Sequence, residues 1–192
     1  MPSNALNDWT TTRAAVLDQF EDTHSSLGGT GPGRRTTTQH INQAYAVLLS
    51  AHFQGFCLDL HDECAELLTQ VISPASIQFS MRGVLVLNRK LDTGNPNPGN
   101  IGSDFNRFGL SFWTKVRRHD ARNEDRQERL EELNDWRNAI AHQDIDPAAL
   151  GTATLPLREV RAWRQACHHL AVSFDQVMRA HILSLLGVSP WP

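Results

Sequence analysis

The stretch TQHINQAYAVLLSAHFQGFCLDLHDECAELLTQVI, residues 38–72, decides the fold of this chain. Its apolar residues recur at intervals of three and four, a spacing that places them along one face of an α-helix. The pattern predicts a helix of about nine turns, or about 50 Å, that would form the backbone of a bundle. Gly55 inside it is better explained by a close contact with another helix than by a hinge. The apolar residues are Ile41, Tyr45, Leu48, Leu49, Phe53, Phe56, Leu60, Cys64, Leu67, Leu68 and Val71.

Patterns on either side of this stretch predict five further helices. They run from the cap Asp8 to about Leu27, from Pro74 to about Leu87, from about Ser103 to Arg118, from Asp120 to about Asp144, and from Pro156, after the candidate cap Thr154, to Gly187. A breaker run occupies residues 94–100. We expect Phe105, Phe108, Phe112 and Trp113 to face the core.

No convincing hairpin accompanies these helices, so the sequence predicts an all-α fold, an antiparallel bundle of about six helices. The 192 residues fit one domain that can bury a core without disulfides. We expect residues 1–37 to form an N-terminal helix and a glycine-rich loop, and residues 38–187 to form the helical core.

The composition narrows the classes of function. A net charge of −3 and a pI near 6.3 argue against coating nucleic acid through bulk positive charge, so any RNA would bind at a local site. Cys57, Cys64 and Cys167 lack CxxC spacing and fit reduced thiols in a cytosolic core. Neither a run of about 18 apolar residues nor a secretory pattern occurs, so we expect a cytoplasmic protein without membrane association.

A second stretch, LNDWRNAIAHQ at residues 133–143, carries the candidate chemistry. At about 100° per residue, Arg137 falls on the helical stripe of Leu130 and Leu133. Asn138 and His142 adjoin the edge of this stripe, one turn apart. Because a guanidinium keeps its proton, Arg137 must meet a carboxylate, a phosphate or a water-filled cleft. The simpler explanation is an ion pair with a structural Asp or Glu, and the alternative is a site for phosphate.

Arg137-Asn138-x-x-x-His142, late in a helix and followed by a polar turn and a long amphipathic helix, resembles the R-x(4 to 6)-H motif of the HEPN family. RNxxxH is a frequent form of that motif. Residues 44–60 look like the long second helix of the RiboL-PSP type of HEPN protein, and the resemblance spans roughly residues 38–187. It implies a metal-independent endoribonuclease without a cofactor, active as a homodimer with a composite site. Such proteins often serve as toxins or antiviral defence effectors, which implies an antitoxin or another regulatory protein as a partner.

The residue types of the motif suit RNA cleavage. Without a metal, a base must remove the proton of a 2′-hydroxyl, an acid must protonate the leaving 5′-oxygen, and a cation must hold the phosphate oxygens. His142 suits either proton transfer, Arg137 suits the phosphate, and Asn138 can orient the phosphate or the imidazole. One His leaves one transfer unfilled, and a two-fold dimer would supply the second. The expected products carry 2′,3′-cyclic phosphate and 5′-hydroxyl ends.

The chain departs from the family pattern at two places. Some HEPN toxins have a Tyr two residues beyond the motif His, which a partner nucleotidyltransferase modifies, but this chain has Asp144 there. We therefore do not expect regulation by that route. Many members also place an acidic residue on the second helix facing the motif Arg. Glu63 and Asp59 are candidates here, although Gln54 occupies the position where such a residue is first sought.

An alternative function uses the same fold. A catalytically inactive HEPN-like dimer that binds a protein or a nucleotide would need Arg137 only as an interface ion pair.

Near the motif helix, Arg117, Arg118 and Arg122 would either track an RNA backbone or simply complement a helix dipole.

Two further sites are not expected. Gly28 and Gly33 have the spacing of a phosphate-binding loop, but Arg34 and Arg35 follow where that loop has a Lys and then a Ser or Thr, and a helix precedes it, so a flexible linker is the better interpretation. Cys57, His61 and Cys64 share a helix face, but a structural zinc ion needs four ligands from separate turns or loops. We therefore predict no metal site.

Overall fold

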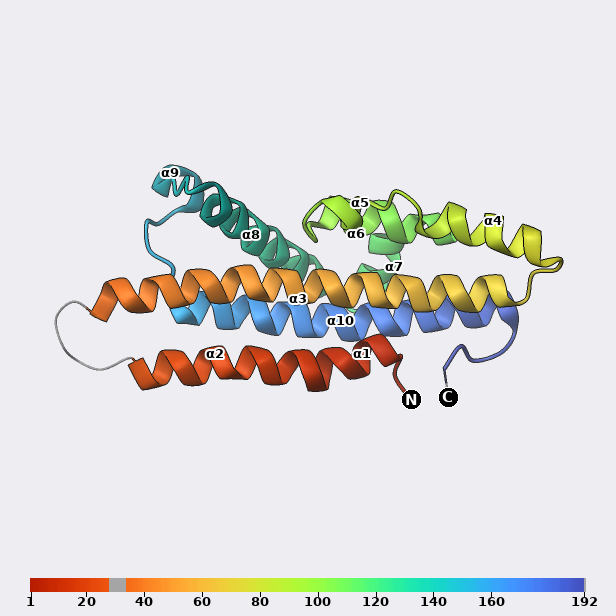
Figure 1. Cartoon of the computed structure of the whole chain (residues 1–192), viewed down its shortest axis with the longest axis horizontal. Coiled ribbons are helices and arrows are strands. Elements are labelled where there is room, and N and C mark those ends of the chain that lie inside the picture. The colour runs from red at the N-terminus through yellow and green to blue at the C-terminus, as the bar shows by residue number, and fades with distance from the viewer. Residues whose placement is uncertain (28–33, 192) are drawn as a thin grey trace.

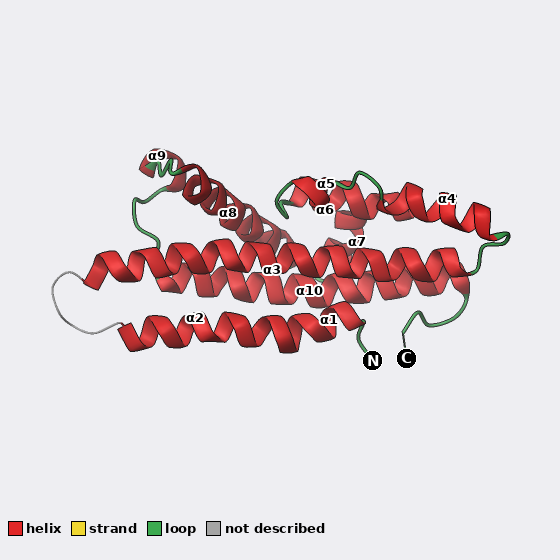
Figure 2. Cartoon of the chain, in the orientation of Figure 1, coloured by secondary structure: helices red, strands yellow, loops and turns green. Residues whose placement is uncertain are grey.

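The computed structural model describes residues 1–27 and 34–191, and its architecture is shown in Figure 1. These residues form helices joined by loops and contain no strand, which confirms the predicted all-α fold (Figure 2). Two long helices, α3 (Arg34–Gln70) and α10 (Leu157–Leu186), lie side by side and run in the same direction. Asn42 of α3 ties this helix to the segment just before α10, because its Nδ2 donates to the carbonyl oxygen of Leu155 at 2.8 Å.

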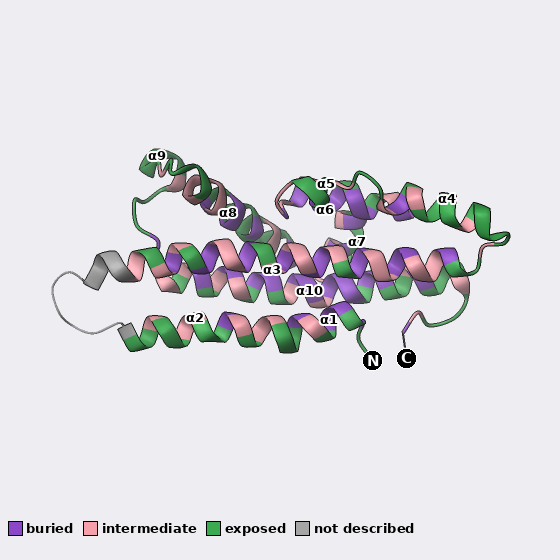
Figure 3. Cartoon of the chain, viewed as in Figure 1, coloured by how far each residue is buried: buried purple, intermediate pink, exposed green. Residues whose placement is uncertain are grey.

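Shorter helices cover both sides of this pair (Figure 1). On one side lie α1 (Asn4–Asp8), the π-helical turn η1 (Trp9–Arg13) and α2 (Ala14–Leu27). On the other side lie α4 (Ala75–Val86), α5 (Lys90–Thr93), α6 (Pro98–Phe105), η2 (Asn106–Phe108), α7 (Phe112–His119) and α8 (Asn123–His142), with α9 (Pro147–Leu150) beyond the end of α8. Buried residues gather along α3 and α10 (Figure 3), so the two long helices carry the core.

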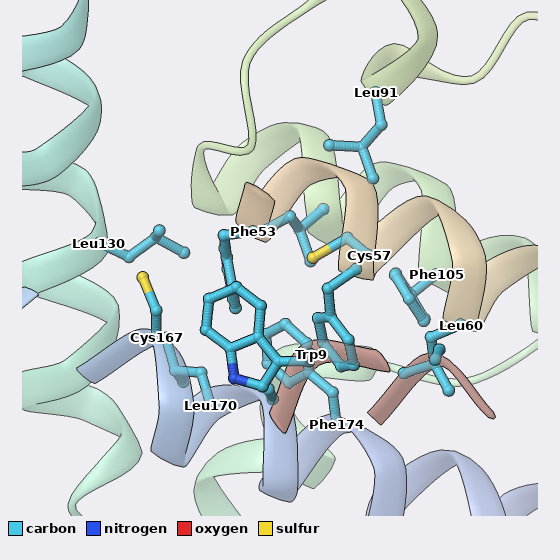
Figure 4. Close-up of a cluster of buried hydrophobic side chains, with 14 of the residues drawn as sticks. Trp9, Phe53, Cys57, Leu60, Leu91, Phe105, Leu130, Cys167, Leu170 and Phe174 are labelled. Carbon is cyan, nitrogen blue, oxygen red and sulfur yellow. The ribbon is translucent and has the colours of Figure 1, made fainter. Parts of the chain in front are cut away.

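Aromatic rings form much of this core, part of which is shown in Figure 4. Phe105 stacks on Phe112 with ring centroids 4.4 Å apart, and Phe112 meets Phe174 of α10 edge-on at 4.8 Å. Phe105 and Phe112 are fully buried, Phe108 is buried, and Trp113 packs half-buried against the same cluster. The predicted inward-facing residues are thereby confirmed.

The N-terminal helical segment begins earlier than predicted. Ser3 caps α1, because its Oγ accepts a hydrogen bond from the backbone N–H of Leu6 at 3.1 Å. Asp8, the predicted cap, lies inside the segment and pairs with Nε of Arg13 at 2.8 Å. The Arg13 guanidinium also lies against Gly55 of α3, where a side chain would collide with it. Gly55 is therefore a close helix contact, as predicted.

The prediction of a single helix from Ser103 to Arg118 is wrong, because α6 and α7 occupy this region. Inside the predicted breaker run, α6 begins at Pro98 because Oδ1 of Asn97 accepts a backbone N–H three residues on, at 2.8 Å. A break between α6 and α7 follows at Gly109, whose φ of 81° lies in the left-handed region that favours glycine. The inward phenylalanines keep helical spacing across this break, so the pattern conceals it.

The other predicted boundaries need small corrections. The long helix begins at Arg34 rather than Thr38, the motif helix spans 123–142 rather than 120–144, and Thr154 does not cap α10, whose N-cap is Pro156. The short helices α5 and α9 were not predicted. The glycine-rich run 28–33 lies outside the described residues. Within the described part of the chain, no helix has the length and apolar character needed to cross a membrane.

Candidate active site

The motif residues lie in the last turns of α8, where this helix diverges from α3 and α10 (Figure 1). In the first half of α8, Leu130 and Leu133 are fully buried. Arg137, one turn later on the same stripe, is only half-buried, and His142 is exposed. The helix then ends at Gln143, whose φ is 55°. The apolar stripe thus extends beyond the part of α8 that the rest of the chain covers.

An amide, and not a carboxylate, holds Arg137. Its Nη1 donates to Oδ1 of Asn138 at 3.2 Å, and it forms no ion pair with any residue in the described ranges 1–27 and 34–191. The two acidic candidates on α3 do not reach it. Glu63 accepts a hydrogen bond from the backbone N–H of Ala5, and Asp59 pairs with Arg13. Both carboxylates face the N-terminal helices, so the simple ion-pair explanation for Arg137 does not hold within one chain.

Gln54 of α3 holds a loop beside the motif. Its Nε2 donates to the carbonyl oxygens of Leu91 and Gly94 at 2.6 and 2.9 Å. Asn95, the next residue of the loop, donates from Nδ2 to Oδ1 of Asn138 at 3.0 Å. The sequence pattern identified this segment only as a breaker run. The feature of the sequence that could have drawn attention to this loop is its density of side-chain amides, since three of residues 94–100 are Asn.

His142 lies in an open cleft of about 530 Å³ at the end of α8. The other lining residues are Asp135, Asn138, Ala139, Asp144, Asp146, Ala149 and Leu150. Because Asn138 also contacts Arg137, this residue connects the His142 cleft to the Arg137 side of the helix. An exposed imidazole there can exchange protons with a bound group. The three carboxylates around it, however, disfavour an isolated phosphate.

The arginines considered for RNA binding lie at the opposite end of α8. Arg122 precedes the helix and Arg137 comes 15 residues later, which corresponds to about 22 Å along the axis. Arg117 donates to Oε1 of Gln127 at 2.9 Å, and Arg118 is exposed. The structure therefore brings Arg137, Asn138 and His142 together but does not bring the three other arginines to them.

Arg122 is exposed and pairs with the half-buried Asp120. Nη2 of Arg122 lies 3.0 Å from Oδ2 of Asp120, and hydrogen bonds from Arg122 hold the pKa of the Asp120 carboxyl well below its usual range. Part of the positive charge at this end of α8 is thus balanced locally.

The side chains considered for a metal site do not converge. Burial raises the pKa of the thiols of Cys57, Cys64 and Cys167, which keeps them protonated. Nε2 of His61 lies 3.2 Å from the carbonyl oxygen of Asp104, so this ring is engaged by the backbone. In the part of the chain that the structure describes, no three His, Cys, Asp or Glu side chains are grouped to hold a cation.

Comparison with known proteins gives one result. A sequence model described as RiboL-PSP-HEPN matches residues 13–179, which include most of the helical segments and all three motif residues. Neither the comparison with curated proteins nor the comparison with solved structures gave a match.

Proposed function

The chain belongs to the RiboL-PSP-HEPN family, and from this membership we propose that it is an endoribonuclease that cleaves RNA without a metal ion. HEPN domains are generally RNase-like. The observation that carries the proposal is the position of Asn138, which contacts the guanidinium of Arg137 and lines the cleft of His142. A cation, an amide and an imidazole thus meet within two turns of one helix.

Each motif residue has a role in this reaction. The 2′-oxygen gives its proton to an imidazole and attacks phosphorus, the bond from phosphorus to the 5′-oxygen breaks, and that oxygen takes up a proton. His142 provides the imidazole. Arg137 supports the reaction because no carboxylate of the described chain neutralises it, so its charge is available to the non-bridging oxygens. Asn138 orients the same phosphate. The products carry 2′,3′-cyclic phosphate and 5′-hydroxyl ends.

The active form in this proposal is a homodimer with a composite site. One chain has one motif His, whereas the reaction has two proton transfers. The half-buried Arg137 lies where the stripe of α8 continues past the bundle, and the carboxylates around His142 call for additional positive charge nearby. A two-fold axis at the end of α8 would bring two copies of Arg137 and His142 into one cleft.

Arg117, Arg118 and Arg122 contact the RNA backbone away from the scissile phosphate in this proposal. They lie near the start of α8, and Arg137 is about 22 Å further along the axis of this helix, so they would act on affinity and leave the chemical step to the motif. Only Arg118 and Arg122 are exposed, and these two are expected to contribute most.

The cellular role that we propose is that of a toxin or an antiviral defence effector in the cytoplasm, controlled by an antitoxin or another regulatory protein. This part rests on the family alone. Asp144 stands where some relatives have a modifiable Tyr, so the control would act by another route. Expression in growing cells tests the role, because the wild type should arrest growth and His142→Ala should not.

The decisive experiment incubates purified protein with mixed RNA in EDTA and analyses the chemistry of the new ends. Wild type should give cyclic-phosphate ends, whereas Arg137→Ala and His142→Ala should lose cleavage. His168→Ala is the matched control, because His168 is also an exposed histidine but lies on α10 away from the motif. Absence of cleavage by a folded, dimeric wild type would favour the inactive binding module.

Mixing subunits tests the composite site. Wild type and His142→Ala are unfolded together and refolded at several ratios. If one cleft needs two histidines, activity should fall as the square of the wild-type fraction, since only dimers with two intact chains are active. A linear decrease would show that each chain acts alone.

A further inference from the structure

The loop that carries Asn95 is fixed between α3 and the motif helix α8. From α3, Gln54 donates to the carbonyl oxygen of Gly94 at 2.9 Å. From α8, the buried Asn134 donates to the carbonyl oxygen of Pro96 at 3.2 Å. Asn95 lies between these two anchored carbonyls. Its position relative to the motif is therefore set from both sides of the loop.

The side-chain amides of Asn97, Asn95 and Asn138 form a chain of hydrogen bonds. A backbone N–H at the Asn97 end determines which atom of each amide is the oxygen. The N–H of Asn100 can only donate, and it donates to Oδ1 of Asn97 at 2.8 Å, so this atom must be the oxygen. The Nδ2 of Asn97 then donates to Oδ1 of Asn95 at 2.8 Å. This leaves Nδ2 of Asn95 to donate to Oδ1 of Asn138 at 3.0 Å.

The guanidinium fixes the other end independently. Arg137 can only donate, and its bond of 3.2 Å also requires the atom of Asn138 that it meets to be the oxygen. Both ends thus give the same orientation of the Asn138 amide. Its Nδ2 makes no hydrogen bond with a described residue, and Asn138 lines the cleft of His142. The two N–H groups of this Nδ2 therefore remain available to donate to a bound group.

We propose that Asn95 is a positioning residue of the ribonuclease site that acts through Asn138, by fixing the amide so that its oxygen holds Arg137 and its nitrogen is left to donate to the scissile phosphate. This inference rests on the function proposed above. A neutral chain of amides takes the place of an acidic partner. Because no carboxylate offsets the guanidinium, its full charge remains for the non-bridging phosphate oxygens.

A double-mutant cycle tests this coupling. Asn95→Ala, Asn138→Ala and the double variant are compared with wild type, with Thr93→Ala as the control, because Thr93 is exposed and lies two residues away in the sequence. Asn95→Ala should lower kcat/KM about 10- to 100-fold, since a misplaced group near the reacting atoms has effects of that order. The double variant should be no worse than Asn138→Ala alone. Additive losses, or a loss no larger than that of Thr93→Ala, would overturn the proposal.

Asn95→Asp provides a second variant of the same shape. The carboxylate cannot donate to Oδ1 of Asn138, and its charge would attract Arg137. We expect kcat to fall at least as far as in Asn95→Ala while the unfolding temperature stays close to that of wild type. Wild-type kcat in a folded Asn95→Asp protein would contradict the role of Asn95.

Nuclear magnetic resonance separates this inference from the proposed function. In ¹⁵N-labelled His142→Ala protein, adding Asn95→Ala should shift the side-chain N–H signals of Asn138 and Arg137, with or without cleavage activity in the wild type. Thr93→Ala should leave these signals in place. If RNA is not cleaved but the signals shift, the ribonuclease proposal fails while the amide chain stands. Unshifted signals would reject the amide chain even in an active enzyme.

Discussion

Nη1 of Arg137 donates to Oδ1 of Asn138 at 3.2 Å, and this bond between neighbours is the contact that the structure gives to the motif arginine. An Arg on a core stripe without an ion pair in the described ranges contributes little to the stability of one chain. It is instead available to a ligand or to a second chain.

Arg137→Ala should therefore abolish function while the fold persists. We expect kcat to fall by about 10²- to 10³-fold, the usual loss when a transition-state donor is removed. The free energy of unfolding, from urea titration at low protein concentration, should change by less than about 0.5 kcal/mol.

Arg164→Ala is the matched control for that stability measurement. Arg164 is similarly half-buried but donates to Asp18 at 2.6 Å and to Glu21 at 3.2 Å. Its loss should cost about 2 kcal/mol, because Asp18 loses its donor and Glu21 loses one of its three. Equal destabilisation by both variants would mean that Arg137 has a structural role after all.

Two glycines in helices should respond to alanine in opposite directions. A Cβ at Gly102 of α6 would lie 2.9 Å from Cδ1 of Trp113, whose indole is held by a hydrogen bond to the carbonyl oxygen of Pro98 at 2.7 Å. Because the ring cannot move freely, Gly102→Ala should destabilise the protein by about 1 to 3 kcal/mol.

Gly83 of α4 is the matched position. A Cβ there meets only Cδ1 of Leu87 at 3.5 Å, an ordinary contact. Gly83→Ala should therefore stabilise the protein by up to about 1 kcal/mol, the difference in helix propensity. Thermal unfolding of both variants checks the pair, and destabilisation by Gly83→Ala would contradict the packing described for α4.

What the sequence could predict depended on whether a feature lies within one helix. Residues 38–72 carry their own periodicity, and Arg137, Asn138 and His142 are neighbours on α8, so both were found by spacing alone. The contact between Asn95 and Asn138 joins residues 43 positions apart, and no local pattern encodes such a contact.

The boundary errors have a different cause. Ser3 and Asp8 are both good caps. Tertiary contacts favour the earlier start, because the backbone N–H of Ser3 donates to Asp175 at 3.0 Å and that of Ala5 donates to Glu63 at 3.2 Å. At Gly109 the helical spacing of the phenylalanines continues although the backbone turns. Sequence pattern reports which side chains are buried better than it reports where the backbone breaks.

Removing the exposed arginines near the start of α8 should weaken RNA binding without a change in chemistry. In Arg118→Ala and Arg122→Ala, kcat should stay unchanged. The slope of log K against log salt should decrease by about 1 for each phosphate that the protein no longer neutralises. Fluorescence anisotropy at several salt concentrations, in the His142→Ala background, measures this slope.

Arg82→Ala is the control for RNA binding. Arg82 pairs with Glu66 at 2.9 Å and lies on α4, at one end of the molecule, whereas α8 begins near its middle (Figure 1). An unchanged slope in Arg118→Ala and Arg122→Ala would remove these residues from the RNA path. A loss of kcat would instead connect them to the motif.

Acid should destabilise the protein through His61. This fully buried ring accepts a hydrogen bond at Nδ1 from Nη1 of Arg89 at 3.3 Å, because an Arg can only donate, and its Nε2–H donates to the carbonyl oxygen of Asp104. The bond from Arg89 requires the neutral imidazole, because a protonated Nδ1 cannot accept, whereas the bond to Asp104 is possible in both forms. Burial, together with the charge of Arg89, lowers the pKa of His61 to about 4 from an ordinary value of 6.5.

The sign of the effect follows from the protons bound in each state. Between pH 6.5 and about 4 the unfolded chain binds a proton at His61 that the folded chain does not, so stability falls as the pH falls through this window. The loss should reach about 3 kcal/mol below the window, and stability above it should not depend on this group.

His61→Gln isolates this contribution, because Gln can also donate to Asp104 and accept from Arg89 but does not titrate. Urea unfolding at pH 7.5 and pH 4.5 should give a larger decrease in the free energy of unfolding for wild type than for the variant. The effects of Asp62, Asp104 and Arg107 around the ring are common to both proteins and cancel in the difference. Equal decreases in the two proteins would mean that His61 takes up its proton without disturbing the fold.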